Sequence, residues 1–215
     1  PPRRHAAHVT SFFEIDLTRV SKLRQKMRAQ FEQQTRQKLT FLPFIIKVVV
    51  DALKQHQVLN AAHTGNRIVY RKQYNIGIAV ALDWGLIVPV IRHAEDLSLS
   101  GLTKSVNDLA DRARNKRLKP EEVQGATFTI TNPGVFGSLA GTPIIPAGTS
   151  AILGLGAIEK RPKVTAGPDG EDVIAIRTCA YFSLSFDHRI VDGADADRFL
   201  ATVKRGLESY PDSEV

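Results

Sequence analysis

Apolar residues along this chain recur with two periods, one typical of helices and one typical of strands. Helical spacing predicts four helices, whose candidate N-caps are Asp16 or Thr18, Thr40, Ser98 or Ser100, and Asp192. Alternating or β-branched runs predict strands at 9–16, 67–72, 75–82, 85–92, 127–132 and 150–158. A long hairpin is expected over 163–186, with its turn at Pro168-Asp169-Gly170, and a shorter one with its turn at Asp83-Trp84-Gly85.

These elements do not alternate in a regular strand–helix–strand order, and no internal repeat is found. The fold class expected is therefore α/β, with two layers and a mixed, largely antiparallel sheet flanked by helices. The length of 215 residues suits one large domain. Residues 1–8, rich in Pro and Arg, are interpreted as the tail of a linker, and residues 9–215 as the domain.

Charge and composition narrow the function classes. The net charge is +7, but the basic residues are dispersed along predicted helices without interleaved aromatic residues, which argues against nucleic acid as a partner. No apolar run reaches the ~18 residues of a membrane span, so no membrane partner is expected. Cys179 is the only cysteine and is expected to be buried in a strand. A disulfide framework is thereby excluded.

The stretch "SFDHRIVDGADADRF" (185–199) carries the first candidate chemistry. His188 stands at the end of an apolar run, where a strand could present it as a general base, although a lone histidine there is more often structural. Asp192 precedes a predicted helix, and aspartate is a preferred N-cap. Asp187 and Arg189 flank the histidine and are expected to be orienting or intersubunit ion-pair groups.

The stretch "TFTITNPGVFGSLAGTPIIPAG" (127–148) carries the second set of candidate catalytic residues. Its threonines fit simple β-propensity, but Thr131 comes last, where its hydroxyl is free to face a cleft. The glycines that follow let the backbone approach a ligand closely. Asn132, beside Thr131, and Ser138, in the same loop, are candidate substrate-binding residues.

The other histidines lie in the tail or near predicted turns, and none pairs with Cys, Asp or Glu at metal-ligand spacing. No metal is therefore expected. Gly154 and Gly156 lie within a strand and lack a helix to receive phosphate, so they are not a dinucleotide-binding fingerprint.

Five segments in order resemble the catalytic core of the dihydrolipoamide acyltransferases, the E2 components of 2-oxo acid dehydrogenase complexes. They are "HVTSFFEIDLTRV", "KLTFLPFIIKVVVDALK", "NIGIAVALDWGLIVPVIRHAEDLSL", "TFTITNPGVFGS" and "SFDHRIVDGADADRFL". The resemblance implies the fold of chloramphenicol acetyltransferase. It also implies that His188 is the general base, that Thr131 stabilises an oxyanion, and that Asp192 orients rather than transfers a proton.

The same resemblance implies the partners. Family members form homotrimers, with the histidine from one subunit and the hydroxyl from the next, and the trimers assemble into a cubic or dodecahedral core. Coenzyme A is a substrate, and the lipoyl group is carried on a separate lipoyl domain N-terminal to the core. The E1 and E3 components bind through regions outside this chain. The implied location is the bacterial cytoplasm or the mitochondrial matrix.

The residues give conflicting indications of which acyl group is transferred. "GVFGSL" followed by "TPII" resembles the succinyl-transferring branch, as does Thr131 in place of serine. Gly156 stands where succinyl-specific members tend to have a histidine, which leaves acetyl and branched-chain groups open. Two other functions remain as alternatives: a chloramphenicol-type O-acetyltransferase and a non-catalytic assembly scaffold.

Overall fold

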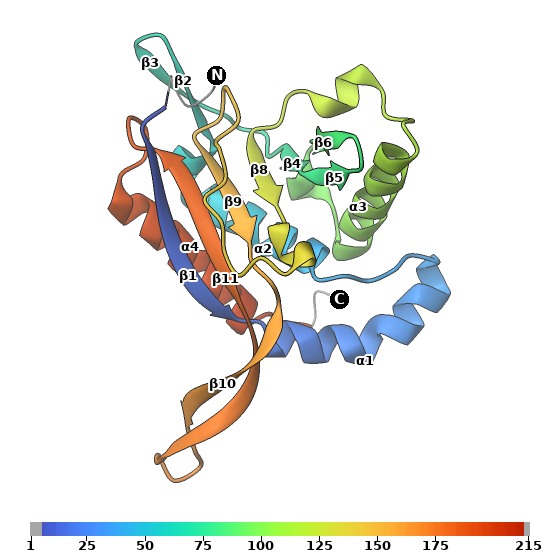
Figure 1. Cartoon of the computed structure of the whole chain (residues 1–215), viewed down its shortest axis with the longest axis vertical. Coiled ribbons are helices and arrows are strands. Elements are labelled where there is room, and N and C mark those ends of the chain that lie inside the picture. The colour runs from blue at the N-terminus through green and yellow to red at the C-terminus, as the bar shows by residue number, and fades with distance from the viewer. Residues whose placement is uncertain (1–5, 213–215) are drawn as a thin grey trace.

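One mixed sheet organises the molecule (Figure 1). The computed structural model describes residues 6–212. Seven strands take part, in the order β1-β11-β9-β8-β4-β7, with β10 added beside β11. They are β1 (His8–Asp16), β4 (Ile76–Ile78), β7 (Val90–Ile91), β8 (Phe128–Thr131), β9 (Ala151–Leu155), β10 (Glu159–Ala166) and β11 (Asp172–Asp187). Among the strands of the described residues, only the pairs β8–β9 and β8–β4 are parallel. The predicted mixed, largely antiparallel sheet is confirmed.

Four α-helices complete the core: α1 (Thr18–Thr35), α2 (Leu42–Gln55), α3 (Leu99–Arg114) and α4 (Gly193–Glu208). Helix α4 packs on β1 and β11, while α2 lies between α3 and α4. The apolar face predicted for the last helix is confirmed, since Phe199, Leu200 and Val203 are fully buried. None of the helices in the described residues is both long enough and apolar enough to cross a bilayer.

Two of the predicted strands are each divided in the structure. The segment 75–82 forms β4 and β5 (Val80–Leu82), and the segment 85–92 forms β6 (Gly85–Ile87) and β7. β5 and β6 make the predicted hairpin, but as a separate small sheet. Pro89 lies between β6 and β7, and the ladder is interrupted there because proline has no N–H to donate. β2 (Ala61–Thr64) and β3 (Arg67–Tyr70) form a second separate hairpin.

The helix starts test the predicted caps. Ser98 accepts from the Gly101 amide at 3.2 Å, and Asp192 accepts from the Asp195 amide at 2.7 Å, so both N-caps are confirmed. Thr40 was the wrong choice, because α2 begins after Phe41 without a side-chain cap and has Pro43 in its first turn. At α1 the N-cap position belongs to Leu17, which also makes no side-chain cap.

The chain around α1 is fixed by other bonds. Asp16, one position outside the N-cap, accepts from the Thr18 amide at 2.8 Å. The Thr18 hydroxyl accepts from the Thr178 amide of β11. Four 3-10 turns link the elements: η2 (Gln57–Asn60), η3 (Ala94–Asp96), η4 (Pro120–Val123) and η5 (Pro133–Phe136).

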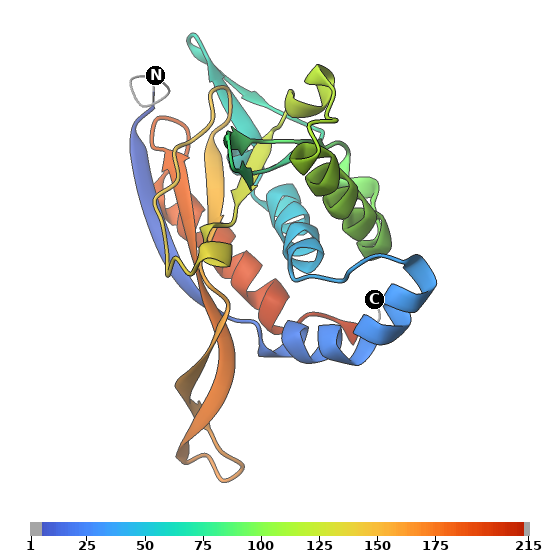
Figure 2. The ribbon, with the colours of Figure 1, turned by 45° about the vertical axis from the view of Figure 1, so that its right-hand side comes forward.

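The β10–β11 hairpin turns where predicted and extends well beyond the helices (Figure 2). Its register pairs Ala166 with Asp172 at the tip and Glu159 with Cys179 at the base. Cys179 is fully buried in β11, as the sequence predicted. Near the tip, Val164 and Ile174 are 66% and 79% exposed, so a single chain leaves apolar side chains of this arm in solvent.

The folded domain begins earlier than the predicted boundary at residue 9. His8 is the first residue of β1 and pairs with Asp187, because the β1–β11 ladder continues to the end of β11. Ala7 also forms hydrogen bonds with Asp187, the last residue of β11, and with His188, which follows it. Residues 1–5 of the predicted linker lie outside the described residues.

Candidate active site

Thr131 ends a central strand of the sheet. The three residues before it on β8 are buried, and Thr131 itself is half-buried where the strand passes into η5. At the other end of the strand, the Thr127 hydroxyl accepts from the Asn75 amide at 3.0 Å. Thr127 therefore anchors the strand, and Thr131 is left at the edge of the cleft, as its position in the sequence predicted.

A contact between two glycines fixes the loop after Thr131. A Cβ on Gly134 would lie 2.3 Å from the Gly156 carbonyl carbon, and one on Gly156 would lie 2.0 Å from the Leu139 carbonyl oxygen. Gly156 donates its amide to Tyr181 at 2.7 Å, and the Ser138 carbonyl accepts from Ala157 at 2.8 Å. No side chain fits at position 156 unless the loop 133–141 moves.

Thr131 faces a large cavity of about 900 Å³. The wall is made by the loop before α2, by β4 and β5, by α3 and by η5, and includes Thr40, Ile78, Val80, Asn107, Thr131 and Asn132. Apolar side chains on its outer part, including Leu86 and Phe136, are 65% and 76% exposed. Lys38 and Arg114 also line it, and among the described lining residues there is no Asp or Glu. The cavity therefore favours an anionic ligand with apolar parts.

His188 lies outside that cavity, in the turn that follows β11. The residue is exposed, and its amide donates to the Ala7 carbonyl at 2.8 Å. The ring lies 5.9 Å from the Phe186 ring, centroid to centroid, and within residues 6–212 it makes no hydrogen bond. A strand end thus presents the histidine to the surface with its nitrogens open to a substrate.

The residues on either side of His188 form an ion pair. Asp187 is 2% exposed, and Arg189 donates to it from Nε at 2.9 Å and from Nη2 at 2.5 Å. Burial disfavours the charged carboxylate, but the hydrogen bonds from the Arg189 side chain and amide and from the Ala7 amide outweigh burial. The pKa of Asp187 is therefore held below its ordinary value.

Thr131 and His188 do not meet within one chain. Thr131 pairs with Gly154 on β9, and Gly154 pairs with Ser183 on β11. His188 lies five residues further along, so it is roughly 15 Å along the sheet and two strand spacings of about 4.8 Å to the side. A base and an oxyanion donor must both lie within about 3 Å of the reacting groups. His188 and Thr131 of one chain therefore cannot act on the same reacting groups.

The other predicted residues differ in their surroundings. Asp192 is exposed and its side chain caps α4, in agreement with an orienting role. Asn132 lines the cavity next to Thr131. Ser138 does not line it, and the Ser138 hydroxyl donates to the Ala140 carbonyl at 3.1 Å, which is a loop-stabilising contact.

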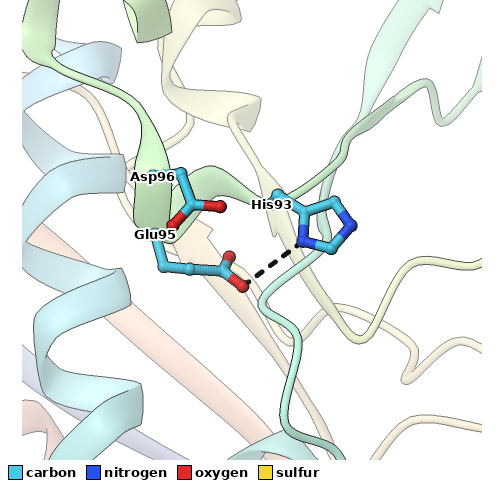
Figure 3. Close-up of side chains that lie close together, drawn as sticks. All are labelled: His93, Glu95 and Asp96. Carbon is cyan, nitrogen blue, oxygen red and sulfur yellow. Dashed lines mark ion pairs between the residues drawn. The ribbon is translucent and has the colours of Figure 1, made fainter.

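One cluster in the described residues has metal-ligand geometry that the sequence spacing did not indicate. His93, Glu95 and Asp96 have ligand atoms within 4.8 Å of one another at the turn after β7 (Figure 3). Glu95 already accepts from the Tyr74 amide at 3.2 Å and lies 3.6 Å from His93 Nδ1. These contacts stabilise the turn, and exposed groups of this kind commonly occur without a metal. The cluster lies away from Thr131 and His188 and is given no role in the chemistry.

The family follows from a profile match. The profile described as "2-oxoacid dehydrogenases acyltransferase (catalytic domain)" matches residues 3–213. The chain belongs to this family. The resemblance carried by the five sequence segments is thereby confirmed.

The relatives of this chain include both acetyltransferases and succinyltransferases. The dihydrolipoyllysine-residue acetyltransferase component of the pyruvate dehydrogenase complex of Mycobacterium tuberculosis is 46% identical, over 94% of this chain and 37% of the relative. The succinyltransferase component of the 2-oxoglutarate dehydrogenase complex of Bacillus subtilis is 45% identical, over 94% and 48%. The chain thus spans less than half the length of either curated relative.

Solved acyltransferase structures share the fold. A probable dihydrolipoamide acetyltransferase from Listeria monocytogenes superposes with a TM-score of 0.92 at 35% identity, covering 97% of this chain and 87% of that one. The cubic core of a pyruvate dehydrogenase multienzyme complex gives 0.87 at 34%, covering 96% and 83%. Chloramphenicol acetyltransferase, at 0.60 and 13% over 95% and 91%, shows the same fold alone. The predicted fold class is confirmed.

Sequence reasoning named the candidate reacting side chains but missed much of their surroundings. It did not single out Lys38 or Arg114, because isolated basic residues carry no positional signal. It also missed the role of Ala7, whose contribution is made by backbone atoms. The Gly156 position was noticed, but only the fold shows that the Leu139 carbonyl occupies the space where a side chain would begin.

Proposed function

We propose that this chain is the catalytic core of a dihydrolipoamide acyltransferase, which moves an acyl group between dihydrolipoamide and coenzyme A at sites shared by two copies of the chain. The observation that carries the proposal is the placement of Thr131 on a cavity wall and of His188 on an exposed strand end too far away to act with it. Each copy then offers a hydroxyl-lined cavity to one neighbour and a histidine to the other.

The chemistry needs only these two side chains. A thiol with a pKa of ~8.5 is only a few per cent thiolate near neutral pH, so an imidazole base that removes its proton accelerates the attack. The sulfur of coenzyme A attacks the thioester carbonyl carbon of acyl-dihydrolipoamide as His188 takes the proton. Thr131 donates a hydrogen bond to the resulting oxyanion. Collapse of the intermediate breaks the bond to the dihydrolipoamide sulfur, which takes the proton back from His188.

The cavity suits the substrates of this reaction. Coenzyme A carries several phosphate charges, and Lys38 and Arg114 provide positive charge without a competing carboxylate among the described lining residues. Apolar side chains such as Leu86 and Phe136 suit the alkyl parts of the pantetheine and lipoyl arms. Coenzyme A and a lipoyl group on a separate domain are therefore the proposed substrates.

Succinyl is the acyl group we favour. The loop after Thr131 resembles the succinyl-transferring branch, and Lys38 or Arg114 would supply a cation for the second carboxylate. Acetyl is the second candidate, since the Mycobacterium tuberculosis relative is an acetyltransferase and Gly156 has no side chain to offer. The almost equal identities of the two kinds of relative do not separate them.

The testing experiment measures initial rates of acyl transfer from acetyl-, succinyl- and isobutyryl-CoA to dihydrolipoamide, with His188→Ala alongside. We expect a preference for succinyl-CoA, and a loss of at least about 100-fold in kcat in the variant, because general-base assistance is removed. A preference for acetyl-CoA would correct the acyl group alone. Full activity in His188→Ala would overturn the mechanism, and inactivity of the wild type with every donor would favour a scaffold or another acceptor.

We also propose that the chain assembles as homotrimers within a larger core. The divided site requires at least two copies, and a related structure is a cubic core of a pyruvate dehydrogenase complex. The exposed apolar side chains of the β10–β11 arm and of η5 offer surface for such contacts.

A further inference from the structure

The turn that carries His188 is hydrogen-bonded on both sides of the histidine. The Asp187 amide donates to the Ser150 carbonyl of the neighbouring segment at 2.8 Å. The Asp187 carbonyl in turn accepts from the amides of Ile190 and Val191 at 2.9 and 3.0 Å. The backbone that holds the exposed ring is therefore fixed, even though the ring itself is open to solvent.

The Asp187–Arg189 ion pair joins the two residues on either side of His188 in this turn. Asp187 Oδ1 accepts from the Arg189 amide at 3.1 Å and from Nε at 2.9 Å, while Oδ2 accepts from Nη2 at 2.5 Å. Only His188 lies between the two paired residues. Tying both neighbours of a single residue leaves its backbone little freedom, so the direction of its Cα–Cβ bond is set.

The segment that enters the domain completes the arrangement. The Ala7 amide donates to Asp187 Oδ1 at 3.2 Å, and the Ala7 carbonyl accepts from the His188 amide at 2.8 Å. Next to it, His8 Nε2 accepts from the Ile145 amide at 3.1 Å, and Nδ1 lies 3.3 Å from the Ala6 carbonyl. The first described residues are thus fastened both to the His188 turn and to the loop before β9.

We propose that Asp187, Arg189 and the backbone of Ala7 form a positioning clamp, which holds His188 in the direction needed to meet the cavity of a partner copy. The inference rests on the proposed function, since the clamp matters to the reaction only if His188 is the base. A displacement of about 1 Å in a catalytic group can cost on the order of 100-fold in rate. The contacts that fix the backbone of His188 all come from its own chain.

The clamp acts by geometry more than by charge. Arg189 neutralises the Asp187 carboxylate, so the pair presents little net charge to the neighbouring ring. Neither residue lines the cavity that holds Thr131. Loss of the clamp should therefore lower kcat while leaving the KM values for the acyl-CoA donor and the dihydrolipoamide acceptor close to those of the wild type.

The test compares variants in the assembled protein, using succinyl-CoA as acyl donor and dihydrolipoamide as acceptor. Asp187→Asn and Arg189→Met remove the ion pair, and Ala7→Pro removes the amide that binds Asp187. We expect kcat to fall roughly 10- to 100-fold in each. Arg189→Lys keeps the positive charge but not the two-bond geometry of the guanidinium, and its kcat should lie between those of Arg189→Met and the wild type. Ala7→Ser keeps the amide and should behave as the wild type.

Glu122→Gln provides the matched control, because Glu122 forms another two-bond ion pair, with Arg112, away from His188. It should lose stability but keep kcat. Should Asp187→Asn fail to fold or assemble, Arg189→Lys and Ala7→Pro carry the test. The clamp is disproved if kcat stays within about twofold of wild type in the folded variants, or if KM rises instead. His188→Ala, measured in parallel, separates this outcome from a failure of the proposed function.

Discussion

At the scale of single residues, the candidate chemistry depends on where each side chain leaves its strand. Thr131 is the last residue of β8 and lines the cavity, whereas Thr129 two positions earlier is buried in the sheet. His188 follows the last residue of β11 and is exposed. In both cases the end of a buried strand places a polar side chain outside the core on a rigid support.

Thr131 offers a direct test at this scale. Thr131→Ala removes the proposed oxyanion donor, and kcat should fall roughly 100- to 1000-fold with little change in KM, because the bond strengthens in the transition state. Thr131→Ser keeps a hydroxyl and should retain most of the rate. Steady-state kinetics in both variants decides the matter. Equal losses in the two would mean that the methyl group, and not the hydroxyl, is required.

At the scale of elements, ion pairs fasten segments that the sheet does not join. Arg112 near the end of α3 donates to Glu122 of η4 at 2.6 and 2.7 Å, and the Lys119 amide donates to the same carboxylate at 2.9 Å. The Arg112 side chain, and then the Lys119 amide, lower the pKa of Glu122 from 4.5 to about 2. The pair therefore stabilises the connection from α3 to β8, the strand that carries Thr131.

This pair predicts a pH dependence of stability. The folded-state pKa of Glu122 lies below its unfolded value, so its contribution is complete above pH 4.5 and is lost as the pH falls toward about 2. Glu122→Gln should be less stable than the wild type at neutral pH, and the difference should shrink through that window. Denaturant unfolding of both proteins at several pH values measures it. A difference that stays constant with pH would contradict the assignment.

At the scale of the whole molecule, the central feature is the distance between the two halves of the site. The strand registers place His188 and Thr131 two strands apart and about five residues out of line, so the site we propose needs a second copy of the chain. This distance supports the proposed assembly. The extended β10–β11 arm, with apolar side chains left exposed, supports the same interpretation (Figure 2).

Mixing of subunits tests the shared site. His188→Ala and Thr131→Ala chains are each expected to be nearly inactive, but dissociation and reassembly together should restore about one quarter of the wild-type activity, because random assembly joins an intact histidine to an intact threonine at that fraction of sites. Activity is measured before and after mixing, with each variant reassembled alone as the control. No recovery in assembled mixtures would mean that both residues act within one chain.

Much of the fold could be predicted from the sequence alone, which also supplied the candidates for the reacting residues. Periodicity located the helices, the long hairpin and the Ser98 and Asp192 caps, because these depend on contacts between near neighbours. It misplaced the start of α2 and joined strands that Pro89 divides, because helix starts and strand breaks also depend on packing. His188 and Thr131 were recognised because their local settings are unusual for polar residues.

Only the tertiary structure decided how those residues are arranged. The order of strands places the two side chains apart, and no local pattern encodes strand order. The Asp187 clamp uses the backbone of Ala7, 180 positions away, and backbone atoms are the same in every sequence. Position 156 requires glycine because the Leu139 carbonyl packs where a side chain would begin. These features depend on long-range packing, which the sequence specifies only through the whole fold.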